Sequence, residues 1–185
     1  MKAHLLVTIV SVSFVSHSQA AEPNRPQPAK PRPEHEFLNQ FVGEWERTTE
    51  AFFEPGKSAT TKGTMTGHMI GNFWVVIDLK ADIGGHAYHG RGTYGFDPLK
   101  TKKYVGTWTD SMAPILWKYE GEADGNRLSL DSEGPHPALP GNFKYRNTWE
   151  FKTKDLLLLT SEMEGPDGKM VTIMKSTCRR KKPKQ

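Results

Sequence analysis

The stretch FKYRNTWEFK, residues 143–152, shows most clearly how this chain folds. One set of its side chains is aromatic or amide, and it alternates strictly with charged or hydroxyl side chains, which are Lys144, Arg146, Thr148, Glu150 and Lys152. Successive side chains of a β-strand point to opposite faces of the sheet. The alternation therefore predicts a strand with one buried face and one solvated face.

Similar segments recur along the chain and are separated by turn-forming dipeptides such as Asp124-Gly125 and Asp167-Gly168. We expect ten strands, at residues 44–53, 61–70, 72–82, 86–97, 102–110, 114–123, 126–133, 143–153, 155–163 and 169–179. The connections between them are short, so we predict an all-β fold, a single up-and-down antiparallel β-barrel of about ten strands, because closure removes the exposed sheet edges. A two-sheet sandwich is the alternative architecture.

The N-terminal residues 1–20 have the three parts of a cleavable signal peptide: Lys2 and His4, an apolar run at residues 5–15, and the small residues of Ser18-Gln19-Ala20. An uncleaved anchor is the alternative, but the eleven apolar residues would cross only about half of a ~30 Å hydrocarbon core. We therefore expect a periplasmic or secreted protein with no membrane span after signal cleavage.

Three further segments complete the domain organisation. Residues 21–33 contain five prolines and predict an extended linker. Residues 34–180 form the expected barrel domain, and it begins with a short helix over residues 33–42 whose apolar side chains share one side. Residues 181–185 form a basic tail. The oligomeric state is not indicated by any of these features.

The net charge of +4 is concentrated at the two ends of the chain. Nine of the 25 basic residues and one of the 21 acidic residues lie outside residues 34–178, so this segment has 16 basic and 20 acidic residues and a net charge of −4. A nucleic-acid-binding domain normally has a basic patch on the fold itself. We therefore expect no nucleic-acid partner; the basic tails are either solvated ends or contacts to an acidic surface.

The sequence Phe41-Val42-Gly43-Glu44-Trp45 resembles the G-x-W signature at the start of lipocalin-like (calycin) barrels. That resemblance implies that Trp45 closes one end of the barrel and that a basic residue near the end of the last strand packs over its ring. Arg179 is the candidate for this cation–π contact. Four segments in order also resemble DUF1579, an uncharacterised bacterial family; they are Gly43-Glu44-Trp45, residues 90–97, residues 103–111 and residues 179–182.

Strand parity separates an inward set of side chains that is rich in tryptophan and tyrosine. The candidate ligand-binding residues are His86, Tyr88, Tyr94, Trp108, Asp110, Trp117, Tyr119, Asn147 and Trp149. An aromatic wall with a few polar groups is typical of a small-molecule pocket. The alternative is a filled barrel in which these polar groups satisfy one another.

Other chemistry has weaker support in the sequence. His86 and His89 are three residues apart on one strand, so they point to opposite faces and we expect no metal site there. Nitrobindin-type barrels bind haem through a histidine near the C-terminus, but the last histidine here is His136, so we expect no cofactor. The single cysteine, Cys178, cannot form an intrachain disulfide, and a reactive role for its thiol has no support.

Three functional hypotheses remain. The first is a protein that binds a small apolar or amphipathic ligand inside the barrel. The second is an enzyme that uses Asp110, His86 and tyrosines on a bound small molecule. The third is a structural envelope protein that needs no pocket. We favour the first, and we expect no catalytic residue.

Overall fold

The computed structural model describes residues 29–54, 56–136 and 140–182, and the expected signal peptide lies outside these ranges. The compact unit that begins at Pro31 consists of two short helical turns followed by ten strands. The elements are α1 (Pro33–Phe37), η1 (Leu38–Phe41), β1 (Gly43–Glu54), β2 (Lys57–Ile70), β3 (Trp74–Ile83), β4 (His86–Asp97), β5 (Lys103–Asp110), β6 (Trp117–Asp124), β7 (Arg127–Pro135), β8 (Asn142–Thr153), β9 (Leu156–Glu164) and β10 (Met170–Arg180).

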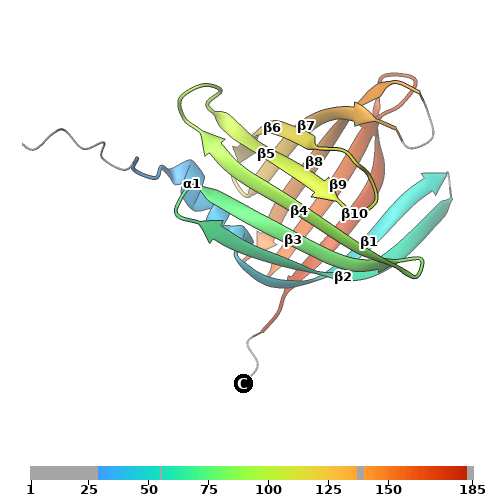
Figure 1. Ribbon diagram of the computed structural model, residues 1–185, viewed down its shortest axis with the longest axis horizontal. Coiled ribbons are helices and arrows are strands. Elements are labelled where there is room, and N and C mark those ends of the chain that lie inside the picture. The colour runs from blue at the N-terminus through green and yellow to red at the C-terminus, as the bar shows by residue number, and fades with distance from the viewer. Residues whose placement is uncertain (1–28, 55, 137–139, 183–185) are drawn as a thin grey trace, which may run out of the picture. The chain divides into compact units, whose positions relative to one another are not determined.

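The ten strands form one closed barrel in which each strand is antiparallel to its sequence neighbours (Figure 1). Closure is made by β1, which pairs with β2 on one side and with β10 on the other. The β1–β10 ladder runs from Trp45↔Arg180 to Ala51↔Met174, so the first and last strands pair continuously along this stretch. This confirms the predicted barrel and excludes the sandwich.

The predicted helix over residues 33–42 is present but is divided. An α-turn covers Pro33–Phe37, and Leu38–Phe41 form a 3₁₀ turn before the chain becomes extended at Val42. In a 3₁₀ helix, side chains three residues apart eclipse one another. Leu38 and Phe41 therefore point to the same side, where both are buried inside the end of the barrel.

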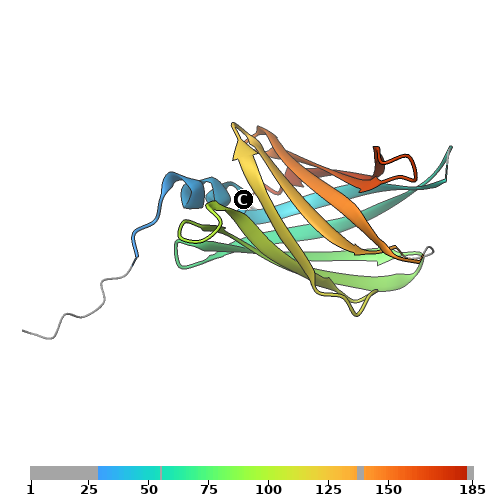
Figure 2. The same ribbon diagram turned by 90° about the horizontal axis from the view of Figure 1, so that it is seen from above.

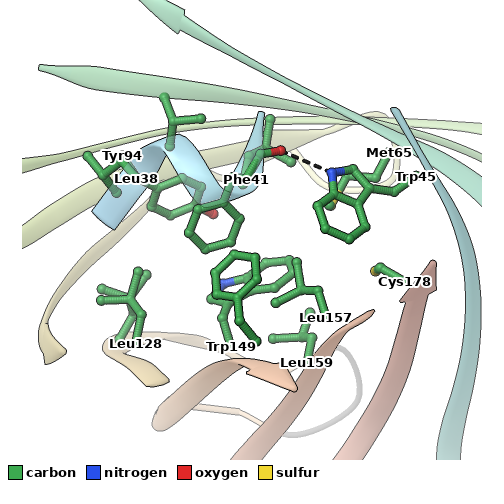
Figure 3. Close-up of a cluster of buried hydrophobic side chains, with 14 of the residues drawn as sticks. Leu38, Phe41, Trp45, Met65, Tyr94, Leu128, Trp149, Leu157, Leu159 and Cys178 are labelled. Carbon is green, nitrogen blue, oxygen red and sulfur yellow. Dashed lines mark hydrogen bonds between the residues drawn. The ribbon is translucent and has the colours of Figure 1, made fainter. Parts of the chain in front are cut away.

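The helical segment lies at one end of the barrel, and the ends of β1 and β2 that lie farthest from it are at the opposite end (Figure 2). Phe41 packs edge-on against Trp149 and Phe151, with ring centroids 5.6 and 4.8 Å apart. The Trp45 indole is fully buried, and its Nε1–H donates to the Phe41 carbonyl oxygen at 3.0 Å (Figure 3). Trp45 thus closes this end, as its resemblance to the G-x-W signature implied.

The cation over Trp45 is Arg180 and not Arg179, so that part of the prediction is wrong. The Arg180 guanidinium carbon lies 4.0 Å from the centre of the Trp45 ring. The same guanidinium donates to the carbonyl oxygens of Gln40 and Lys154, at 3.0 and 2.9 Å, and to that of Val42. Because Arg180 is the register partner of Trp45, it lies on the same face, while Arg179 pairs with Glu46 and is exposed.

Gly67 on β2 lets the helical segment approach the barrel wall. A Cβ atom at this position would lie only 2.1 Å from the Phe41 carbonyl oxygen, well inside contact distance. The obstructing atom belongs to the backbone, so a side chain at Gly67 cannot be accommodated by a simple rotamer change. The seating of η1 on β2 therefore depends on glycine at this position.

Candidate functional site

The interior of the barrel has two halves with different exposure to solvent. Next to η1, the inward side chains form a continuous buried core that includes Leu38, Trp45, Leu128 and Leu157; we call this the packed half (Figure 3). Toward the other end, inward side chains are only partly buried; this open half has on its wall Tyr88, Trp108, Trp117, Tyr119, Tyr145 and Asn147. Because these residues point inward, their exposure shows that solvent reaches the inner wall at this end.

The structure divides the nine predicted ligand-binding residues into three groups. Tyr94 and Trp149 point inward but are buried in the packed half, each about one-twentieth exposed. The open half contains Tyr88, Trp108, Asp110, Trp117, Tyr119 and Asn147. His86 lies at the outer end of β4, paired with Ile83 beside the β3–β4 turn, and is exposed. His86 shares the parity of the inward residues but lies outside the enclosed part of the wall, because parity selects a face and not a position along the barrel axis; its role in binding stays a prediction.

The side chains of the open half hold one another through a few specific contacts. The Asn147 amide donates to the Tyr119 hydroxyl at 3.3 Å, and the Trp108 indole N–H donates to Asp110 at 3.2 Å. Trp117 and Tyr145 meet edge-on with ring centroids 5.0 Å apart. The inner wall is therefore a set of braced aromatic rings with polar tips.

Asp110 is a turn-stabilising carboxylate. Its Oδ1 accepts the backbone N–H groups of Met112 and Ala113, at 2.9 and 3.2 Å, while Oδ2 accepts the Trp108 indole. His86 is four residues along β4 from Gly90, the register partner of Asp110, and this corresponds to about 13 Å of strand. General acid–base catalysis needs groups within hydrogen-bond reach of a shared substrate. The structure does not bring Asp110 and His86 together in this way.

The phenols of the open half are neutral hydrogen-bonding groups. Burial raises the pKa of Tyr88 to about 12, and the nearby Asp110 carboxylate adds to the effect. Burial likewise raises the pKa of Tyr119 to about 12. Near neutral pH both hydroxyls are therefore protonated and can donate to or accept from a ligand.

Sequence reasoning missed Arg47, which lies on the inner face of β1 and is 7% exposed. Its Nη2 donates to the Ser176 hydroxyl at 2.8 Å and contacts the Met174 sulfur at 3.8 Å. Its Nε is buried and has no hydrogen-bond partner. Arg47 shares the parity of Trp45, so strand alternation could have placed it inside once Trp45 was taken as inward.

Cys178 lies opposite Arg47 in the β1–β10 ladder and is fully buried. Burial raises the pKa of this thiol to about 11, although the Arg47 charge acts in the opposite direction. The reactive form of cysteine is the thiolate. Cys178 is therefore an unreactive core residue near neutral pH.

Two further observations concern the described residues. They contain no group of three or more His, Cys, Asp or Glu side chains arranged to hold a metal ion. No helix among them is long and apolar enough to cross a membrane. Two hollows along β7 and β8 are lined largely by charged side chains, and Arg146 and Asp131, which border both, pair with each other at 2.7 Å.

Comparisons with known proteins agree with this architecture. A family model described as "Protein of unknown function (DUF1579)" matches residues 30–180. Solved structures of similar fold include the S-type phycobiliprotein lyase CPES from Guillardia theta, at 15% identity and a TM-score of 0.53, covering 80% of this chain and 93% of that one. Rv2717c from M. tuberculosis matches at 9% identity and a TM-score of 0.54, covering 82% and 99%. No curated protein matches the chain.

Proposed function

We propose, for a chain that belongs to the DUF1579 family, that the barrel binds a small, partly hydrophobic ligand in its open half. The observation that carries this proposal is the partial exposure of inward-facing aromatic residues such as Tyr88, Trp108 and Tyr119. Small-ligand sites are concave and mainly apolar, with a few polar groups that orient the ligand. The fold itself is shared with a phycobiliprotein lyase and gives no closer indication of a substrate.

The arrangement of the interior supports binding in preference to a purely structural role. The packed half, sealed by η1, Trp45 and Arg180, already contains a continuous buried core. Tyr88, Trp108 and Tyr119 pack against that core and still remain partly exposed. Large, partly exposed aromatic surfaces typically mark interaction sites. The neutral hydroxyls of Tyr88 and Tyr119 supply orienting groups.

Export is part of the same proposal and is supported by the signal-peptide pattern of residues 1–20. The direct measurement is the N-terminal sequence of the protein recovered from its native cells. A mature chain that begins near Ala21 supports export, and a chain that still begins at Met1 or Lys2 in the cytoplasm contradicts it.

The binding test uses Nile red, a neutral apolar dye, with matched variants on β2. Thr61 is inward-facing opposite Thr49, whereas Thr60 faces solvent opposite Glu50. We expect the unmodified protein to enhance Nile red fluorescence, Thr61→Trp to abolish most of that enhancement by filling the open half, and Thr60→Trp to leave it unchanged. An absence of saturable binding, or equal effects of the two variants, contradicts the proposal.

A further inference from the structure

The barrel interior contains a charged side chain, Arg47, for which the described part of the chain supplies no opposite charge. Arg47 is 7% exposed, and a guanidinium stays protonated in proteins. The groups that act electrostatically on it are Cys178, Tyr88 and Tyr94. Each of these has a raised pKa and is uncharged near neutral pH. No carboxylate is among them, although buried charges are normally paired.

The acidic residue at an inward strand position cannot serve as the counter-charge. Asp110 is on β5, and both of its oxygens are occupied by the Trp108 indole and by the turn that follows. Among the described ion pairs, none includes Arg47. The buried cation is thus left without a partner of opposite charge within the described part of the chain.

Three hydroxyls belong to the cluster around this cation, and two buried polar atoms of the cluster have no hydrogen-bond partner. The Ser176 hydroxyl accepts from Arg47 and also lies 2.9 Å from the Thr49 hydroxyl. Ser161 is the register partner of Met174, whose sulfur contacts Arg47, and its hydroxyl is buried with no partner. The Nε of Arg47 is likewise unpartnered. A guanidinium and three hydroxyls are the donors that an oxyanion requires.

This cluster lies where the packed half meets the open half. Along the inner face of β1, exposure increases from Trp45, which is fully buried, through Arg47 to Thr49 and Ala51, which are partly exposed. The Arg47 charge acts on the pKa of Tyr88, opposing the larger effect of burial, and Tyr88 belongs to the wall of the open half. A ligand in the open half would therefore reach Arg47 with its inner end.

We propose that Arg47, Ser176, Thr49 and Ser161 bind the carboxylate of an amphipathic monocarboxylic acid, whose apolar body lies against the aromatic wall of the open half. A planar guanidinium matches the two oxygens of a carboxylate. A single negative charge is favoured because no second arginine or lysine is buried among the described residues. The inference rests on the proposed function and specifies the chemical class of its ligand.

The test compares the affinities of the protein for cis-parinaric acid and for its methyl ester, with Nile red as the neutral reference. The acid and ester share one chain and differ in charge. We expect the acid to bind about 10- to 100-fold more tightly than the ester, the factor expected of a hydrogen-bonded charge pair. Arg47→Met should remove this preference, while Arg91→Met, on the outer face of β4, should leave both the preference and the affinity for Nile red unchanged.

The outcomes separate this inference from the function on which it rests. Saturable binding of Nile red with equal affinity for acid and ester overturns the carboxylate site and leaves the barrel a ligand-binding protein. A preference for the acid that survives Arg47→Met also overturns it. Failure of all three probes to bind overturns both proposals. If Arg47→Met does not fold, the acid-to-ester ratio of the unmodified protein decides the question.

Discussion

Arg47→Met should stabilise the ligand-free protein, which is unusual for the replacement of a buried residue. In the absence of ligand, Arg47 is a desolvated cation whose described hydrogen bonds all start from Nη2. A methionine of similar length can occupy the same space beside Met174, because its unbranched thioether adapts to irregular gaps. The change removes a charge without opening a large cavity.

The magnitude follows from two opposing contributions. Desolvating an ion that has no counter-charge costs several kcal/mol, and the substitution removes that cost. The substitution also removes the hydrogen bond from the guanidinium to Ser176, which contributes about 1.5–3 kcal/mol. Ser176 keeps its contact with the Thr49 hydroxyl at 2.9 Å, so it is not left unpaired. We expect a net gain of about 1–2 kcal/mol in the free energy of unfolding.

The assay is urea denaturation of protein freed of bound ligand, followed by both tryptophan fluorescence and circular dichroism. The urea concentration at the midpoint of unfolding should rise. The slope of the free energy of unfolding against urea concentration should stay the same, since the surface exposed on unfolding hardly changes. Thermal unfolding should shift upward by roughly 2–8 °C. A loss of more than about 1 kcal/mol would refute the reasoning, because it would show that the folded protein already compensates the Arg47 charge.

Three further predictions concern other parts of the barrel. Gly67→Ala should lower the free energy of unfolding by about 3 kcal/mol or more, because the added Cβ would meet the Phe41 carbonyl oxygen and displace η1. The measurement is urea denaturation, and an unchanged midpoint contradicts this close approach. Arg180→Gln should lower the free energy of unfolding by about 2 kcal/mol in the same assay, because it removes the contact with Trp45 and the hydrogen bonds to backbone carbonyls. Arg179→Gln, at an exposed position, is the near-neutral control, and equal effects of the two variants contradict the placement of Arg180. Tyr88 and Tyr119 should ionise near pH 12 in an ultraviolet titration of the folded protein. Their pKa values in the folded state lie above the unfolded value near 10, so their contribution to stability should be lost as the pH rises from 10 to 12. Ionisation of all tyrosines near pH 10 in the folded protein contradicts this prediction.

The number and order of the strands could be predicted because they depend on local pattern. Segments such as residues 143–152 alternate with a period of two, and turn dipeptides such as Asp124-Gly125 separate them, so all ten strands were expected near their observed places. Their ends shift by a few residues, as at β6, which begins at Trp117 and not at residue 114. The residue at which a strand begins or ends depends on contacts with neighbouring strands, which the local sequence pattern does not contain.

The candidate site was predicted less completely, because parity identifies a face of the sheet and gives no depth. Tyr88 and His86 share parity on β4, yet Tyr88 lies on the inner wall and His86 is exposed beside a turn. Arg47 was overlooked because a charged residue is seldom expected in a barrel core. Only the assembled barrel shows that its nearest groups are uncharged.

The sequence by itself determined the strands and their antiparallel order, since both depend on residues adjacent in the chain, while the position of Trp45 was implied by its resemblance to the G-x-W signature. The tertiary structure alone decided the register that places Arg180 over Trp45, the division into a packed and an open half, and the isolation of the Arg47 charge. A register shift of one residue would move Arg179 to the inner face. These features depend on pairing between β1 and β10, which are more than one hundred residues apart, and no local pattern specifies that pairing.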